Sequence, residues 1–271
     1  MSDTDAARPA TQPSLFIPHG GGPCFFMPDP RGTWTAMGDY LRSLPATLPE
    51  PPRAILVVSG HWEERAFTFN GAAQHPGLIF DYYGFPPETY RLIWPAPGAP
   101  WLAERGAALL REAGLPSGVD PERGFDHGVF VPLKVMFPDA EVPVVQMSLH
   151  ASLDPALHVA AGEALAPLRE EGVLVLGSGM SFHNLRAMGD PRVAEPSRQF
   201  DTWLKQAAAS APADRAEQLD RWGEAPYARL CHPREEHLLP LMVAAGTSRE
   251  PGTHDYGDMV LGGAVSAFRF D

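Results

Sequence analysis

The sequence is poor in cysteine and has no long hydrophobic run. Only Cys24 and Cys231 occur among 271 residues, too few for a disulfide framework or a cysteine-rich zinc site. No apolar stretch approaches the ~20 residues that span a bilayer, and the first residues show no apolar core of a signal peptide. These absences predict a soluble protein of the reducing cytoplasm, with no membrane as partner.

Positive charge is also scarce. Lysine and arginine together number 21 against 33 aspartates and glutamates, so the net charge is −12 at pH 7. Nucleic acids bind proteins that present a basic surface, and none is therefore expected as a partner. Histidine, in contrast, is well represented, with ten residues.

Short aliphatic runs alternate along the chain with longer helical patterns. The run at 55–58 is apolar on both faces, as in a buried parallel strand. Strands are also expected at 14–18, 63–69, 142–149, 173–176 and 259–270, and helices at 34–43, 88–93, 100–113, 155–170, 201–209, 213–221 and 234–245. This alternation predicts an α/β fold with a mostly parallel central sheet flanked by helices on both faces. We expect a disordered lead-in over residues 1–13 and one catalytic domain over residues 14–271.

Three of the expected strands lead into a histidine. His19 follows the run at 14–18, His61 follows the Ser59-Gly60 pair that breaks the run at 55–58, and His183 follows a glycine-containing turn after 173–176. Ligand sites of open α/β sheets lie beyond the carboxyl ends of their strands, so we expect these imidazoles in one site. Gathered imidazoles most often hold a metal ion.

Two further histidines have a similar context. His127 lies in the loop Gly124-Phe-Asp-His-Gly before an expected helix, and His237 lies at the start of another helix. The remaining five are expected elsewhere: His75, His158 and His254 at the surface, His232 at the start of a helix, and His150 either at a turn or behind the site. Nucleophile-elbow, dinucleotide-binding and HExxH motifs are absent from the sequence.

Seven motifs together resemble a known family. They are His19-Gly-Gly-Gly-Pro, Val-Val-Ser-Gly-His61-Trp, Asp81-Tyr-Tyr-Gly-Phe-Pro, Gly124-Phe-Asp-His-Gly, Pro143-Val-Val-Gln-Met-Ser, Ser178-Gly-Met-Ser-Phe-His-Asn-Leu-Arg and Glu236-His-Leu-Leu-Pro-Leu. In this order they resemble the class III extradiol ring-cleavage dioxygenases, most closely the DOPA 4,5-dioxygenase branch.

The resemblance implies an oxidoreductase of aromatic compound catabolism that opens a catechol ring with O2 at a mononuclear non-haem Fe(II). It implies His19, His61 and His237 as metal ligands, His127 as the acid/base and His183 beside the substrate and O2. In one branch of the superfamily the third ligand is a glutamate, so Glu236 stays an alternative. Zinc is a second candidate for the metal of a purified sample, since it stands above iron in the Irving–Williams order.

Two other functions stay open at this point. The same histidines suit a zinc-dependent hydrolase, or a non-catalytic metal-binding relative. The aromatic segment from Phe80 to Phe85 either walls the catechol pocket or only packs in the core. Asn184 and Arg186 are expected to orient His183. The identity of the catechol, the position of ring cleavage and the oligomeric state, a homo-oligomer included, are not determined.

Overall fold

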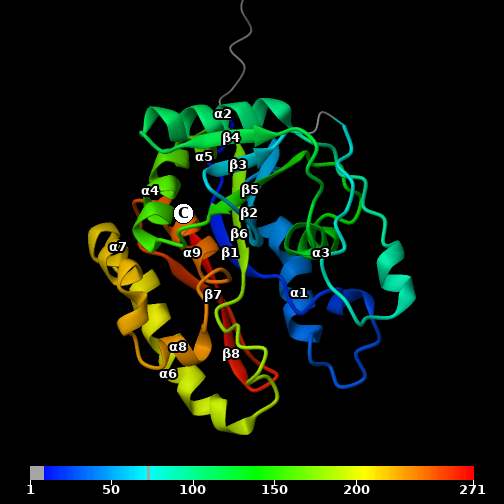
Figure 1. The fold of residues 1–271 in the computed structure, drawn as a ribbon, viewed down its shortest axis with the longest axis vertical. Coiled ribbons are helices and arrows are strands. Elements are labelled where there is room, and N and C mark those ends of the chain that lie inside the picture. Colours follow the sequence, from blue (N-terminus) through cyan, green and yellow to red (C-terminus); the bar gives the residue numbers. More distant parts are fainter. Residues whose placement is uncertain (1–8, 72–73) are drawn as a thin grey trace, which may run out of the picture.

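The computed structural model describes residues 9–71 and 74–271, and within them the strands form one mixed sheet (Figure 1). The strand order is β4-β3-β5-β2-β6-β1-β8-β7. At its centre, four strands pair in parallel: β1 (Ser14–Pro18), β6 (Val173–Gly179), β2 (Ala54–Glu64) and β5 (Val144–His150). The prediction of a mostly parallel central sheet is confirmed.

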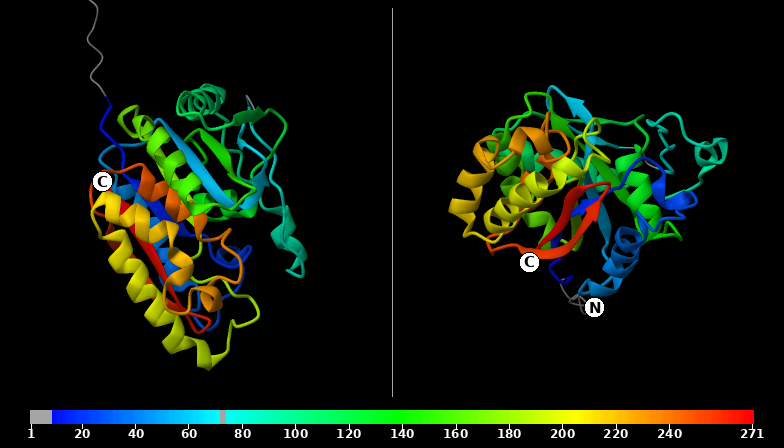
Figure 2. Two further views of the ribbon diagram at one scale, coloured as in Figure 1. Left: turned by 60° about the vertical axis from the view of Figure 1, so that its left-hand side comes forward. Right: turned by 90° about the horizontal axis from the view of Figure 1, so that it is seen from below.

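Antiparallel pairs occur on both sides of this centre. β3 (Phe67–Asn70) is antiparallel to β5 and carries β4 (Ser117–Asp120) in parallel. On the other side, β8 (Gly263–Phe270) is antiparallel to β1, and β7 (Thr253–Val260) is antiparallel to β8. The helix α6 (Ala194–Ala208) packs along β8 and β7 (Figure 2).

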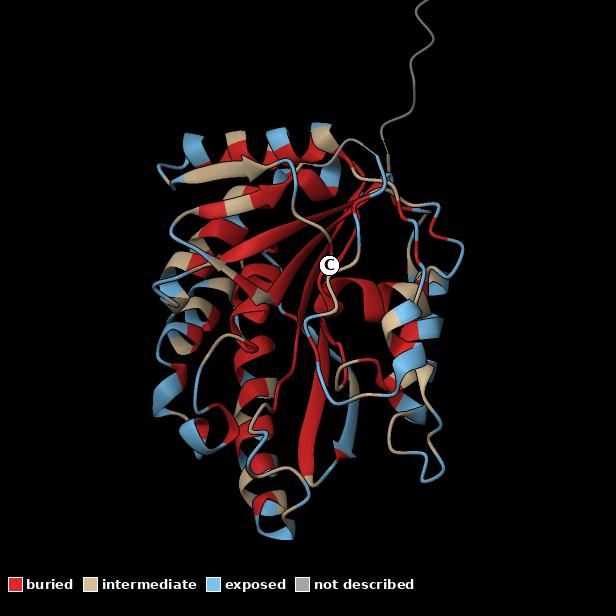
Figure 3. Cartoon of the chain, turned by 45° about the vertical axis from the view of Figure 1, so that its right-hand side comes forward, coloured by how far each residue is buried: buried red, intermediate tan, exposed pale blue. Residues whose placement is uncertain are grey.

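The central strands are buried on both faces, because successive side chains of a strand point to opposite sides. Ile55 and Val57 of β2 pack in a cluster with α1 (Thr35–Ser43) and α3 (His127–Met136). Leu56 and Val58 pack in the opposite cluster with α2 (Pro100–Glu112), α4 (Pro155–Leu165) and α9 (Leu239–Gly246). Figure 3 shows these strands almost entirely buried, and the expected helices on both faces are confirmed.

The other helices are short or peripheral. They are α5 (Pro167–Glu170), α7 (Pro212–Asp220), α8 (Ala228–Cys231) and the 3-10 helices η1 (Cys24–Phe26), η2 (Leu44–Thr47), η3 (Pro87–Arg91), η4 (Pro191–Val193) and η5 (Trp222–Glu224). The expected helix at 88–93 is therefore the 3-10 helix η3. The expected strand at 63–69 divides between the end of β2 and β3, and β4 was not expected because its Ser-Gly-Val-Asp sequence has little strand character.

The single closing strand expected at 259–270 is wrong, because this segment belongs to a hairpin of β7 and β8. The strands are joined at Leu261 and Gly262, whose φ angles are 48° and 87°. Two consecutive residues with positive φ are typical of the two-residue hairpin turn. Leucine rarely adopts a positive φ, so the sequence gives no signal for a turn at Leu261.

The helix expected at 234–245 begins later, at Leu239. Pro240 lacks an N–H group and therefore fits the first helical turn, whereas a helix begun at 234 would have placed it in the interior. His237 consequently lies in a turn before α9.

The first eight residues of the expected lead-in lie outside the described part of the chain. In the remainder of the lead-in, Gln12 is buried, and its backbone N–H donates to the Arg169 carbonyl at 3.0 Å. Among the described residues, no helix has the length and apolar character needed to cross a membrane.

Candidate metal centre

Two histidines reach the site from neighbouring parts of the sheet, in which β6 lies between β2 and β1. His19 follows β1, and its N–H donates to the Gly179 carbonyl at the end of β6, at 3.1 Å. His61 lies within β2 rather than beyond its end, which corrects the expectation that Ser59 and Gly60 end the strand. The register of β2 against β5 shifts between Val58 and Glu63. Such an irregularity re-aims side chains without ending the strand.

The third histidine, His237, comes from the turn before α9. This turn packs directly on the central strands β2 and β6. The Met180 N–H donates to the His237 carbonyl at 3.0 Å. A Cβ atom on Gly179 would lie 2.1 Å from that carbonyl oxygen, and one on Gly60 would lie 2.8 Å from the Glu236 carbonyl oxygen. The two glycines therefore permit the close approach that brings His237 to the site.

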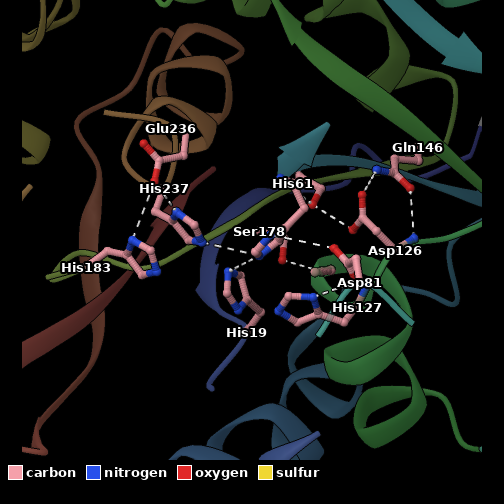
Figure 4. Close-up of polar contacts among 12 residues, drawn as sticks. His19, His61, Asp81, Asp126, His127, Gln146, Ser178, His183, Glu236 and His237 are labelled. Atoms are coloured by element: carbon pink, nitrogen blue, oxygen red, sulfur yellow. Dashed lines mark hydrogen bonds and ion pairs between the residues drawn. The ribbon is translucent and has the colours of Figure 1, made fainter. Parts of the chain in front are cut away.

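The imidazoles of these three residues converge through their Nε2 atoms (Figure 4). His61 Nε2 lies 3.3 Å from His19 Nε2 and 3.2 Å from His237 Nε2. Two nitrogen ligands at about 2.0–2.2 Å from one ion, in tetrahedral or octahedral geometry, lie about 2.8–3.6 Å apart. Both distances from His61 Nε2 fall within this range, as expected for ligands of one metal ion.

Burial keeps these imidazoles neutral. It lowers the pKa of His19 and His61 well below the ordinary value, and the charges of the neighbouring histidines lower it further. Burial also lowers the pKa of His237 to about 4. A metal ion binds the neutral form of imidazole, so the electrostatics of the cluster favour coordination.

Glu236 contacts the opposite nitrogen of His237, away from the Nε2 cluster. Its Oε1 accepts a hydrogen bond from His237 Nδ1 at 2.9 Å and lies 3.5 Å from His183 Nδ1. Burial alone would raise the pKa of Glu236, but hydrogen bonds from His183 and His237 outweigh it and hold the pKa well below its usual range. The ionised carboxylate thus fixes the tautomer of His237, as partners of metal-bound histidines do.

Two other sets of side chains are close enough to hold an ion: His19, His61 and His127, and His183, Glu236 and His237. The first set contains His19 and His61 of the converging trio, and the second contains His237. The trio His19, His61 and His237 is the strongest candidate for the ligand set. His61 Nε2 lies within 3.3 Å of the Nε2 atoms of both partners. Burial lowers the pKa of all three imidazoles and so favours the neutral form that binds a metal ion.

His127 begins α3, as expected, and is held by a residue that sequence reasoning did not single out. Asp81 Oδ1 accepts hydrogen bonds from His127 Nδ1 at 2.7 Å and from the His127 backbone N–H at 3.0 Å. Burial raises the pKa of Asp81, yet the hydrogen bonds from His127 lower it overall. Nε2 is the ring nitrogen left to exchange a proton. The available signal was the position of Asp81 at the head of the motif Asp81-Tyr-Tyr-Gly.

A buried network lies behind His127 and was also missed. The Ser59 hydroxyl donates to Asp126 Oδ1 at 2.8 Å. Gln146 Nε2 donates to Asp126 Oδ2 (Figure 4). Burial and the nearby Asp81 raise the pKa of Asp126. Because Asp126 precedes His127 and Ser59 precedes His61 by two residues, the network ties α3 to β2.

His183 stacks on His237, with ring centroids 3.3 Å apart and an interplanar angle of 15°. Its charged neighbour is Glu236, not the expected residues downstream. Asn184 Nδ2 instead donates to the Leu230 carbonyl at 2.8 Å, and the Arg186 backbone N–H donates to Asn184 Oδ1. Glu236 therefore contacts both His183 and His237.

Of the other histidines, His75 and His254 are exposed as expected. His158 is completely buried, which contradicts the expected surface position. Its Nε2 accepts from the His150 backbone N–H at 3.2 Å and its Nδ1 donates to the Asp154 carbonyl at 2.6 Å, so local backbone groups satisfy it. His150 lies at a turn, with Nδ1 2.7 Å from the Ser152 hydroxyl. His232 is buried and follows the end of α8, which corrects the expected position at the start of a helix. Its Nε2 lies 2.9 Å from the Ser181 carbonyl.

The five site histidines open onto a cavity of about 560 Å³. Its other walls come from the glycine segment after His19, the aromatic segment around Tyr82, the loop after β6 and the turn between β7 and β8. Tyr82 is 8% exposed and packs against Phe130 of α3, while Tyr83 is 91% exposed. The aromatic segment therefore contributes both to the cavity wall and to the core.

A family model described as the catalytic LigB subunit of aromatic ring-opening dioxygenase matches residues 15–266. The chain belongs to this family of class III extradiol dioxygenases, as the sequence motifs indicated.

Named relatives are similar over most of the chain. Dioxygenase tasH of Hapsidospora irregularis is 43% identical over 263 residues, which are 90% of this chain and 81% of that protein. The 4,5-DOPA dioxygenase extradiol of Beta vulgaris is 40% identical over 204 residues, 73% of this chain and 74% of that protein. The crystal structure of an uncharacterized protein from Escherichia coli K12 is similar with a TM-score of 0.75 and 30% identity, covering 96% of this chain and 100% of that chain.

Proposed function

We propose that this protein opens the ring of a catechol-type aromatic with O2 at a mononuclear iron(II) ion held by His19, His61 and His237. One observation carries the proposal: His61 Nε2 lies 3.3 Å from His19 Nε2 and 3.2 Å from His237 Nε2, and all three imidazoles line the same cavity. Family membership supports ring-opening dioxygenase chemistry, with O2 and a small aromatic molecule as the reactants.

The donor set suits this metal. Three neutral imidazoles leave further coordination positions to the substrate and O2. When bound, iron(II) supplies the redox chemistry that allows O2 to react with a catechol. Zinc binds the same ligands but has no redox chemistry, so a zinc-loaded sample would be inactive in ring opening.

His127 is the proposed acid/base. Asp81 holds its Nδ1 at 2.7 Å, so Nε2 takes a proton from the catechol hydroxyl and later returns it to the oxygen released when the O–O bond breaks. The ion pair with Asp81 stabilises the imidazolium that exists between these two steps.

His183 is the proposed contact to substrate or O2. It lines the cavity and stacks on His237, while Glu236 lies 3.5 Å from its Nδ1. With Nδ1–H directed at Glu236, the neutral ring presents Nε2 as a hydrogen-bond acceptor for a hydroxyl group in the cavity.

The reaction conserves atoms. The ring bond that breaks joins a hydroxyl-bearing carbon to the neighbouring carbon that bears no hydroxyl. The O–O bond breaks as well. One oxygen atom ends in a new carboxyl group and the other in a new aldehyde or ketone, and no further reductant is consumed.

Oxygen uptake by the iron-loaded protein tests the proposal. The metal-free protein is loaded anaerobically with Fe(II) and mixed with a panel of catechols in buffer containing 18O2. We expect one O2 consumed per catechol, both labelled atoms in the product, and a yellow ring-opened product. The zinc-loaded protein and the His61→Ala variant serve as inactive controls. Ester hydrolysis under argon without oxygen uptake would instead establish a hydrolase, and failure of every catechol and ester would indicate a non-catalytic relative.

A further inference from the structure

The cavity beyond the histidines is apolar, and its surroundings point to the substituent of the substrate. We propose that the substrate is a catechol bearing an uncharged, apolar substituent, bound between the Leu185–Met188 loop and the wall of Trp34 and Phe85. The inference rests on the proposed ring-opening function and names the substrate class of the same site.

The size of the cavity is the first observation. At about 560 Å³ it falls within the roughly 300–1,000 Å³ typical of sites for drug-sized ligands. A bare catechol coordinated at the histidines would fill only the inner end, so the remaining volume is available to a substituent on the ring.

One wall of the outer cavity is built from aliphatic and thioether side chains. Leu185 and Met188 come from the loop after β6, and Leu261 comes from the turn between β7 and β8. The Gly189 N–H donates to the Leu261 carbonyl at 2.7 Å and ties the two segments together. Leu185 is 69% exposed and Leu261 is 40% exposed, so apolar surface continues to the mouth of the cavity.

A second part of the cavity wall is aromatic and lies against the glycine segment. A Cβ atom on Gly21 would lie 3.2 Å from the Trp34 ring, and one on Gly22 would lie 2.8 Å from the Phe85 ring. The absence of side chains on these glycines lets both rings pack directly on the backbone. Trp34 and Phe85 then present apolar surface to the cavity.

Charge in the cavity disfavours an ionic substituent. Among the described residues that line it there is neither lysine nor arginine, and Asp81, the lining carboxylate, is already paired with His127. A carboxylate placed there would lose hydration without gaining a cationic partner, and an ammonium group would compete with His127 for Asp81.

The neighbouring arginines belong to a separate hollow on the other side of His183 and Leu185. Arg234 is committed to Glu63 through two contacts of 2.5 and 2.6 Å. Arg186 is exposed and lines the same hollow, so it is the cation that a charged substituent would have to reach.

A matched substrate series tests the inference on the iron-loaded full-length protein. We compare kcat/KM for 4-pentylcatechol, 3-(3,4-dihydroxyphenyl)propionate and dopa, of which the first two have side chains of similar size. We expect a preference of at least about tenfold for the alkylcatechol, as for methylene groups in an apolar pocket. Leu185→Arg, which changes a largely exposed side chain, should shift the alkyl-to-propionate ratio toward the propionate by roughly tenfold. The matched control Ile93→Arg changes an exposed side chain (76%) outside the cavity and should leave the ratio unaltered.

Each outcome separates this inference from the proposed function. If no catechol is opened, the proposed function fails and the inference fails with it. If the propionate or dopa is opened as well as the alkylcatechol, ring opening stands and the apolar substrate class is wrong. Loss of that activity in Arg186→Ala would then assign the charged group to Arg186. An unchanged ratio in Leu185→Arg would also overturn the assigned wall.

Discussion

Two carboxylate–imidazole pairs flank the histidine cluster, and they differ in what surrounds the carboxylate. Glu236 belongs to a turn whose main chain packs on β2, close to Gly60. Asp81 belongs to a loop that packs through aromatic side chains, and its side chain is 24% exposed compared with 14% for Glu236. The first pair orients His237 toward His61, whereas the second orients His127 at the cavity wall and has its other carboxylate oxygen 3.7 Å from His61 Nδ1.

The difference separates two tasks that the same chemical pair can perform. A metal ligand needs a fixed nitrogen position, which contacts to the backbone of the sheet provide. An acid/base needs access to the substrate, which a position at the cavity provides. Changes in the Glu236 pair should therefore act mainly on metal binding, and changes in the Asp81 pair mainly on turnover.

The largest expected effect on turnover is at His127. In His127→Ala we expect kcat to fall by about 10²–10⁴-fold, as for loss of a general acid/base, while iron content stays near that of the wild type. Metal analysis and steady-state kinetics on one preparation measure both quantities. His61→Ala, which removes a proposed ligand, is the control that should lose the metal. Equal metal loss in the two variants would make His127 a ligand and end the separation of tasks.

The next effect concerns the carboxylates themselves. Glu236→Gln keeps the size of the side chain but removes its charge, and we expect iron affinity to weaken by about 10–100-fold. Asp81→Asn should weaken iron affinity less than Glu236→Gln does, because Asp81 Oδ2 lies 3.7 Å from His61 Nδ1 and makes no closer contact with a proposed ligand, and it should lower kcat. Competition with a chelator measures the affinity, and oxygen uptake at saturating iron measures kcat. If both variants lose affinity to the same extent, the two pairs do not have different roles.

A smaller effect is expected at His183, which contacts the Glu236 pair but opens onto the cavity. His183→Ala should retain the metal, raise KM for the catechol or O2 by roughly tenfold through loss of one hydrogen bond, and lower kcat. Metal content, the melting temperature and the kinetic constants are measured together. A lower melting temperature with normal constants per folded molecule would give His183 a packing role.

The smallest effect on turnover is expected at His158, a buried histidine outside both pairs. Burial lowers its pKa to about 4, so the folded state binds fewer protons than the unfolded state between about pH 6.5 and pH 4. Its contribution to stability is complete above about pH 6.5 and declines as the pH falls, by about 3 kcal/mol at pH 4.

Urea unfolding of the metal-free protein from pH 7.5 to pH 4 measures this contribution. The difference in unfolding free energy between wild type and His158→Gln should shrink or reverse as the pH falls, while His75→Gln, at an exposed position, should show no such trend. A pH-independent difference for His158→Gln would contradict the buried neutral state. Turnover at neutral pH should stay unchanged in both variants.

The parts of the fold that local patterns describe were predictable. The apolar runs at 14–18 and 173–176 became β1 and β6, since an apolar run bounded by glycine or proline carries its own strand signal. The turn at Leu261 was not predictable, because it uses a leucine with positive φ. Pro240, in contrast, was a local signal for the start of α9 that the predicted helix at 234–245 overlooked.

By itself, the sequence determined the α/β class, the family and the five histidines that meet at one edge of the sheet. Their motifs and strand ends are local features that can be read along the chain. Only the tertiary structure decided which distant group each imidazole faces: Asp81 holds His127, and His237 directs its Nε2 toward His61. Hydrogen bonds and burial depend on distances between separate segments, and those distances exist only once the sheet has brought the segments together.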